Sequence, residues 1–219
     1  MAYGLSRFQF NHLTKHLIWP LVLLIVTSPP ALAAQKLIIA FGDSLTAGLG
    51  LAQNEAFPAR LEAALAARGI AARVENAGVS GDTTAGGRAR LGWILGERTP
   101  DLVILELGAN DALRGLPPEA ARDNLAAMLA LLKRRRIPVL LAGMLAPPNL
   151  GTGYGAAFNR LYPALAQKYA VPLYPFFLDG VAGKPALNQA DGLHPTAAGV
   201  TVIVKRIMPW VLGALNVTE

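Results

Sequence analysis

The chain contains no cysteine among its 219 residues. Neither a disulfide nor a cysteine-linked lipid anchor can therefore form, so the fold must be stabilised by its hydrophobic core. Because 53% of the residues are apolar and only 16% are charged, the composition is typical of a compact globular protein. The length suits a single domain with a sizeable core, which we expect over residues 34–219.

Histidine and serine are nearly absent beyond residue 33, where only His194, Ser44 and Ser80 remain. Most zinc sites need a cluster of histidine and cysteine ligands, so we expect neither a metal nor a cofactor. Glycines at 42, 48 and 50 do not have the spacing of a phosphate-binding loop, which disfavours a nucleotide-binding module. A serine hydrolase needs only a hydroxyl, an imidazole and usually a carboxylate, and the chain can supply each of these.

Long hydrophobic runs are also scarce, and the first one lies in a distinct N-terminal segment. Arg7 and Lys15 precede an apolar run over residues 17–26, and small residues follow at 31–33. This pattern is typical of a secretory signal peptide over residues 1–33, which predicts a periplasmic or secreted protein. An uncleaved anchor is the weaker alternative, because the run is about half of the roughly 20 residues that a spanning helix needs. We expect no later stretch to be long and apolar enough to span a bilayer.

The formal net charge of +6 falls to +4 when Arg7 and Lys15 leave with the signal peptide. This moderate positive charge is compatible with anionic substrates or with transient contact at a membrane surface. The densest cationic run, at residues 133–136, closes a predicted helix, where cations complement the helix dipole. We therefore expect no nucleic-acid partner, and we expect a monomer.

From residue 35 onward, apolar strand-like runs alternate with helical stretches, which predicts a three-layer α/β/α sandwich around a five-stranded parallel sheet. The expected strands cover residues 37–41, 73–75, 102–107, 139–142 and 171–174. The expected helices cover residues 57–67, 84–95, 118–135, 155–169 and 196–215. Ligands of open parallel sheets bind beyond the carboxyl ends of the strands, so the site is expected there.

Four polar or glycine-rich blocks are expected at that edge of the sheet. They are Gly42-Asp43-Ser44-Leu45, Asn76-Ala77-Gly78-Val79-Ser80-Gly81, Gly108-Ala109-Asn110-Asp111 and Asp191-Gly192-Leu193-His194-Pro195. In this order and spacing, the blocks resemble those of the SGNH (GDSL) esterases and lipases, named for a Ser, Gly, Asn and His. The resemblance covers nearly the whole mature chain and implies a flavodoxin-like fold.

Within that family, the chain is most similar to small bacterial periplasmic members described as multifunctional thioesterase, lysophospholipase and arylesterase. The narrower similarity lies in residues 40–48, 79–83, 105–111, 113–115 and 172–177. One departure is Ala109, where a second glycine is common, and we expect no loss of chemistry there.

The resemblance implies that Ser44 is the nucleophile, that His194 is the general base and then the general acid, and that Asp191 orients the imidazole. It also implies three donors to the developing oxyanion: the backbone N–H groups of Ser44 and Gly78 and the side-chain amide of Asn110. Physically, the short Asp191-to-His194 spacing lets one turn carry both groups.

Three further polar residues of the blocks are expected to act structurally. Asp43 and Asp111 are expected to brace their loops, although Asp43 is an alternative triad carboxylate. Ser80 is expected to hydrogen-bond within its own glycine-rich loop.

Substrate choice is expected to depend on two apolar loops, at residues 143–153 and 176–189. Their candidate substrate-binding residues are Met144, Leu145, Leu150, Phe176 and Leu178. These side chains could line a channel for an acyl chain or could simply seal the core, and the sequence leaves both interpretations open. The resemblance implies a small-molecule or lipid ester substrate, such as a lysophospholipid, an acyl-CoA or an aryl or alkyl ester. The alternatives are an O-acetylesterase of cell-wall or exopolysaccharide sugars and a non-catalytic carrier.

Overall fold

The computed structural model describes residues 1–4 and 35–217. Nearly all of the expected signal peptide, including its apolar run, lies outside the described residues. The signal peptide and its cleavage therefore stay predictions.

Five parallel strands form one sheet in the order β2-β1-β3-β4-β5. The strands are β1 (Lys36–Gly42), β2 (Ala72–Gly78), β3 (Leu102–Glu106), β4 (Val139–Ala142) and β5 (Leu173–Tyr174). The strand order reverses direction at β1, because β2 lies on one side of it and β3 on the other. The predicted parallel sheet is confirmed. Strand β2 extends beyond the predicted residues 73–75, because it pairs with β1 along its full length.

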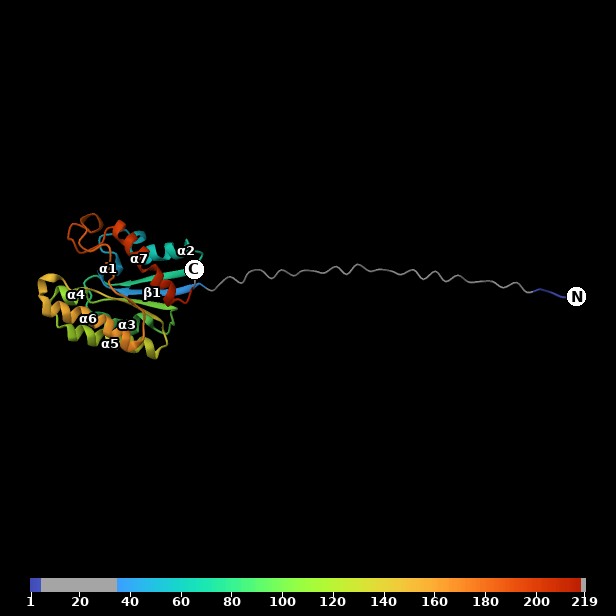
Figure 1. Ribbon diagram of the computed structural model, residues 1–219, viewed down its shortest axis with the longest axis horizontal. Coiled ribbons are helices and arrows are strands. Elements are labelled where there is room, and N and C mark those ends of the chain that lie inside the picture. The colour runs from blue at the N-terminus through green and yellow to red at the C-terminus, as the bar shows by residue number, and fades with distance from the viewer. Residues whose placement is uncertain (5–34, 218–219) are drawn as a thin grey trace. The chain divides into compact units, whose positions relative to one another are not determined.

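Helices cover both faces of the sheet, which confirms the predicted three-layer architecture (Figure 1). Helices α3, α5 and α6 pack on one face, and α2 and α7 pack on the other. The helices are α1 (Ser44–Ala47), α2 (Phe57–Ala66), α3 (Thr84–Leu95), α4 (Ala109–Leu113), α5 (Pro118–Arg134), α6 (Thr152–Tyr169) and α7 (Ala197–Ala214). The five long helices match the predicted ones to within a few residues. Helices α1 and α4 are single turns and were not predicted, because they are too short to give a helical periodicity in the sequence.

Local capping chemistry explains where several helices begin. The Thr83 hydroxyl accepts a hydrogen bond from Gly86 N at the start of α3, and the Thr196 hydroxyl accepts one from Gly199 N at the start of α7. Helix α5 begins at Pro118, where the fixed φ of proline suits a first turn. Lys133 and Arg134 lie in its last turn, as predicted for the cationic run.

Helix α7 corrects one expectation of the sequence analysis. Its 18 residues have a mean hydropathy of 1.4, so by length and composition alone it could cross a membrane. One face of the helix is instead buried against the sheet and α2, with Ile203, Ile207 and Val211 at most 1% exposed. The helix is apolar because it belongs to the core of the domain.

The central strands read as continuous apolar runs because both faces of the sheet are covered. Every residue of β3 is buried, including the acidic Glu106 at its carboxyl end. This end of the sheet carries Ser44 and the other polar blocks.

Candidate active site

Ser44 and His194 come from opposite ends of the sequence and meet at the carboxyl edge of the sheet. Ser44 is the first residue of α1, directly after β1, and His194 lies in the loop before α7. The imidazole Nε2 of His194 lies 2.8 Å from the Ser44 Oγ. On the other side of the ring, Nδ1 lies 2.6 Å from Asp191 Oδ2. The structure therefore brings the three predicted residues into one hydrogen-bonded series.

Asp191 is oriented by the backbone of its own turn. Its Oδ1 accepts hydrogen bonds from Leu193 N at 2.9 Å and His194 N at 3.0 Å. Gly192, directly after Asp191, has a φ of +70°, a left-handed conformation that favours glycine. The backbone N–H of His194, its imidazole and the Leu193 N–H together lower the pKa of Asp191 to about 2. An ionised Asp191 favours the proton on Nδ1 and leaves the Nε2 lone pair facing Ser44.

Two amides that the sequence analysis did not consider anchor the histidine loop. Gln189 Nε2 donates to Leu49 O at 2.7 Å and to Pro195 O at 2.9 Å, which ties the loop to the segment after α1. Asn188 Nδ2 donates to the carbonyls of Val181 and Lys184. No motif marked these residues, because their role depends on contacts between remote segments.

Asp43 and Asp111 brace their loops, as predicted. Asp43 is fully buried; its Oδ1 accepts from Leu45 N at 3.0 Å and caps α1. Burial raises the pKa of Asp43 to about 6, although hydrogen bonds from Leu45 N and Asn110 lower it. Asp111 accepts hydrogen bonds from the Thr84 N–H and hydroxyl at 2.8 and 2.6 Å, which holds the start of α3.

The expected oxyanion role of Gly78 is not supported by the geometry. Its N–H already donates to Asn76 Oδ1 at 3.0 Å. A Cβ at Gly78 would collide with the Ala47 backbone and lie 2.8 Å from Asp43 O. The glycine is therefore needed because β2 packs closely against α1, and the expectation of a free donor there is wrong.

Asn110 lies beside the nucleophile, but its amide nitrogen is already engaged. Nδ2 donates to Asp82 O at 2.9 Å and to Asp43 Oδ2 at 3.2 Å. In the described part of the chain, the backbone N–H groups of Ser44 and Gly81 have no acceptor. Gly81 lies in a turn that is closed by the hydrogen bond from Asp82 N to Val79 O. Asn110 donates to the carbonyl of Asp82 in the same turn. Both N–H groups are therefore free to donate to a developing negative charge.

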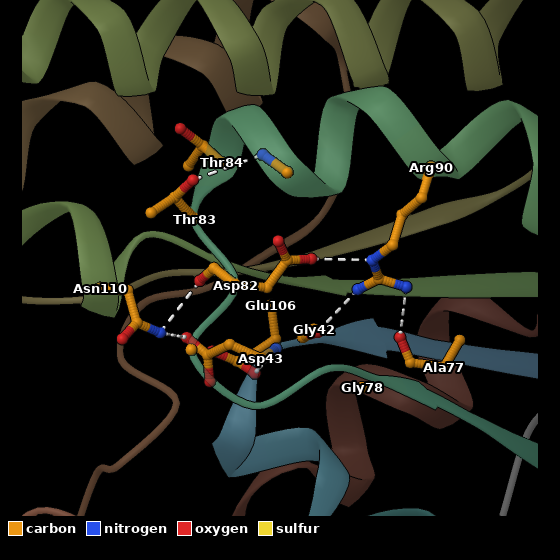
Figure 2. Close-up of polar contacts among 12 residues, drawn as sticks. Gly42, Asp43, Ala77, Gly78, Asp82, Thr83, Thr84, Arg90, Glu106 and Asn110 are labelled. Carbon is orange, nitrogen blue, oxygen red and sulfur yellow. Dashed lines mark hydrogen bonds and ion pairs between the residues drawn. The ribbon is translucent and has the colours of Figure 1, made fainter.

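Arg90 joins the end of β1, the end of β2 and the turn that follows β2, as Figure 2 shows. Its guanidinium donates to Gly42 O at 2.8 Å, to Ala77 O at 2.8 Å and to Asp82 Oδ2 at 2.7 Å. It also lies 4.0 Å above the ring centroid of Phe41. The side chains of Arg90 and Asp82 are only 18% and 11% exposed, so this ion pair is poorly screened by solvent. Arg90 lies on α3 and was not singled out from the sequence.

An apolar cavity of about 290 Å³ opens beside Ser44, His194 and Asn110. Four of the predicted substrate-binding residues line it: Met144, Leu145, Phe176 and Leu178. Leu150 does not line the cavity and instead packs, partly buried, against the core, so this expectation is wrong. Leu113 and Leu193 also line the cavity and were missed, because both are flanking residues of the motifs rather than members of apolar runs.

A larger groove of about 630 Å³ lies between the carboxyl ends of α5, α6 and α7, and none of the four sequence blocks contributes to it. Within residues 1–4 and 35–217, no three acidic or histidine side chains are grouped as metal ligands. The polar groups beside the smaller cavity, namely the hydroxyl, imidazole and carboxylate, are suited to acyl transfer.

Comparisons with known proteins agree with this geometry. The GDSL-like Lipase/Acylhydrolase family matches residues 40–202. Esterase TesA of Pseudomonas aeruginosa is 44% identical over 81% of this chain and 88% of its own length. Thioesterase 1/protease 1/lysophospholipase L1 of Escherichia coli K12 is 39% identical over 85% of this chain and 88% of its own.

Solved structures show the same fold. The crystal structure of AlinE4, an SGNH-hydrolase family esterase, has a TM-score of 0.72 and 52% identity, and the match covers 84% of this chain and 99% of AlinE4. The chain therefore belongs to the GDSL-like lipase and acylhydrolase family and is a serine esterase with the SGNH-hydrolase fold.

Proposed function

We propose that this protein hydrolyses acyl esters and thioesters, including lysophospholipids, acyl-CoA and simple aryl or alkyl esters, through an acyl-enzyme on Ser44. The observation that carries the proposal is the 2.8 Å contact between Ser44 Oγ and His194 Nε2 beside an apolar cavity. The names of the relatives, an esterase of Pseudomonas aeruginosa and a thioesterase and lysophospholipase of Escherichia coli, support ester, thioester and lysophospholipid substrates.

In the acylation step, Ser44 Oγ attacks the carbonyl carbon of the substrate while His194 Nε2 accepts the hydroxyl proton. The imidazolium that forms is stabilised by Asp191, whose carboxylate lies 2.6 Å from Nδ1. His194 then donates its proton to the leaving alcohol or thiol, and the acyl group stays on Ser44 as an ester. In the deacylation step, His194 takes a proton from water, and the resulting hydroxide attacks the acyl-enzyme to release the acid.

The tetrahedral intermediates of both steps need hydrogen-bond donors for their oxyanion. The free N–H of Ser44 supports its assignment as one donor, and the Gly81 N–H is available in the adjoining turn. Asn110 can serve as a further donor if its amide gives up the longer of its two bonds, the 3.2 Å bond to Asp43. Because Asp82 O would still hold the same amide nitrogen, Asn110 would keep its orientation during this exchange.

The cavity supports a preference for acyl groups longer than acetyl. Its lining includes Leu113, Leu145, Phe176 and Leu178, whose apolar surface suits a hydrocarbon chain. A chain-length series of p-nitrophenyl esters tests this preference, with kcat/KM expected to rise from acetate toward longer acyl groups. A steep preference for acetate would instead favour a carbohydrate O-acetylesterase and would overturn the acyl-chain assignment.

The nucleophile is tested by a fluorophosphonate probe, which labels activated serines covalently. The wild-type protein should take up one label per chain, and Ser44→Ala should take up none. Ser80→Ala provides the matched control, because it removes the only other serine of the mature chain and should leave labelling unchanged. Labelling that survives in Ser44→Ala would show that the nucleophile is elsewhere.

We also infer that the protein is exported, on the strength of the charge and hydropathy pattern of residues 1–33. Mass spectrometry of the protein recovered from a periplasmic fraction should find a chain that begins near residue 34. A full-length chain confined to the cytoplasm would contradict this inference.

A further inference from the structure

We propose that Glu106 is a positioning residue for the nucleophile, and that it holds the one-turn helix of Ser44 as a neutral, protonated carboxyl group. The proposal rests on the function proposed above for Ser44. Glu106 does not line the cavity beside Ser44, so it is assigned no contact with the substrate.

Helix α1 depends on external contacts for its orientation. It has only four residues, and so short a helix has no stability of its own in water. Glu106 Oε2 accepts a hydrogen bond from Thr46 Oγ1 at 2.7 Å and lies 3.4 Å from Asp43 N. The two donors flank Ser44 in the sequence, so a single oxygen atom holds the chain on both sides of the nucleophile.

Gly42 makes room for this carboxyl group beneath the turn. A Cβ at position 42 would collide with both Thr46 Oγ1 and Glu106 Oε2. The glycine of the Gly-Asp-Ser block therefore has a steric reason, because any side chain there would displace Glu106. Figure 2 shows Glu106 beside Gly42 and Asp43.

The surroundings of Glu106 favour its neutral form. The residue is 0% exposed, and within the described chain its Oε1 has no hydrogen-bond partner and no lysine, arginine or histidine bonds to either oxygen. The titratable groups that face it are the Asp43 carboxylate and, from α6, the Tyr162 hydroxyl, which donates to Leu107 O. Burial and the charge of Asp43 raise the pKa of Glu106 well above its ordinary value.

Asp43 and Glu106 are both buried and their charges repel, so they cannot both be ionised cheaply and one of them holds a proton. Asp43 is the ionised partner at neutral pH, because it accepts hydrogen bonds from Leu45 N and Asn110. A neutral Glu106 then supplies an acceptor for Thr46 and Asp43 N without placing a second negative charge behind the triad. The Arg90 guanidinium lies nearby but donates to Gly42 O, Ala77 O and Asp82.

The test compares Glu106→Gln, which imitates the protonated acid, with Glu106→Leu, which has no acceptor. With a p-nitrophenyl ester, Glu106→Gln should keep kcat within about threefold, whereas Glu106→Leu should lose about 10- to 100-fold in kcat with little change in KM. Glu62→Leu is the matched control, because Glu62 also accepts a backbone N–H, from Val74, but lies away from the site. It should leave kcat unchanged.

Two further measurements keep the test decisive if Glu106→Leu does not fold. Thr46→Val removes the donor to Glu106 and should lower kcat about tenfold, while Thr46→Ser retains the hydroxyl and should be nearly fully active. The infrared difference spectrum between wild type and Glu106→Gln at neutral pH should contain the C=O band of a protonated carboxyl group, which a merely structural contact would not require.

Several results would overturn the proposal. Full activity in Glu106→Leu or Thr46→Val would show that the contact does not position Ser44. Loss of activity in Glu106→Gln, or a missing carboxyl band, would show that Glu106 acts as an anion. Failure of the wild-type protein itself to hydrolyse the ester or to take up the fluorophosphonate would instead remove the proposed function, and this inference with it.

Discussion

The imidazole Nε2 of His194 lies 2.8 Å from the Ser44 Oγ across a separation of 150 positions in the chain. The contact depends on Gln189, whose amide binds the carbonyls of Leu49 and Pro195 and so holds the two segments together. Proton transfer from the serine requires a contact of this length.

Removing either partner of this contact should abolish most of the catalysis. Ser44→Ala and His194→Ala should each lower kcat by about 10⁴-fold or more. The first variant lacks the attacking hydroxyl, and the second lacks the acceptor for its proton. Steady-state kinetics with a p-nitrophenyl ester measures the loss. The melting temperature should stay close to that of the wild type, and kcat within tenfold of wild type would refute the triad.

Asp191→Asn should reduce kcat by about 10²- to 10⁴-fold while leaving KM nearly unchanged. The neutral amide cannot stabilise the imidazolium, and its NH₂ group can favour the wrong tautomer of His194. Asp179→Asn is a suitable control, because this carboxylate pairs with the exposed Arg206 instead of the histidine. Equal activity of the two variants would mean that Asp191 only shapes its turn.

Asn110→Ala should cost about 10²- to 10³-fold in kcat, the usual loss for one oxyanion donor. The matched control is Asn124→Ala, which removes an amide that bonds Thr84 and Arg88 away from the nucleophile. Full activity of Asn110→Ala would show that its bonds to Asp43 and Asp82 are its whole function.

Arg90→Met should destabilise the fold by about 3–5 kcal/mol, because it leaves the poorly exposed Asp82 carboxylate without its ion-pair partner and removes one donor from each of the carbonyls of Gly42 and Ala77. Denaturant unfolding measures this loss. Arg88→Met, on the same helix but exposed, should change the free energy of unfolding by less than about 0.5 kcal/mol. Similar effects of the two substitutions would contradict the role assigned to Arg90.

Asp43, whose pKa is raised, and Asp191, whose pKa is lowered, should give opposite dependences of stability on pH. Asp43 has a pKa raised to about 6, so its contribution to stability is greatest below its unfolded value of 3.8 and is lost as pH rises through about 6. Asp191 has a pKa lowered to about 2, so its contribution is present above 3.8 and is lost as pH falls toward 2.

Unfolding of the wild type and Asp43→Asn over this pH range checks the sign for Asp43. The difference between the two proteins should change in favour of Asp43→Asn as pH rises through about 6. A difference that is constant with pH would refute a raised pKa.

Much of the fold could be predicted because its signals are local. Strand β4 and helix α3 have the predicted boundaries, since apolar periodicity and the flanking proline and glycine residues depend only on neighbouring positions. Strand β2 was predicted too short, because its polar residues extend by pairing with β1 rather than by their own propensity. The single turn of α1 gave no periodic signal, since it is maintained by Asp43 and Glu106.

The sequence by itself determined which groups were available for chemistry, because residues 34–219 contain one imidazole and two serines, and three of the four blocks follow predicted strands. Only the tertiary structure decided which donors are free and which acid is neutral. It showed that the Gly78 N–H is already bonded, that Leu150 lies outside the cavity and that Glu106 is buried beneath Ser44. The physical reason is that hydrogen-bond occupancy and desolvation depend on atoms from remote segments, and no local stretch of residues specifies them.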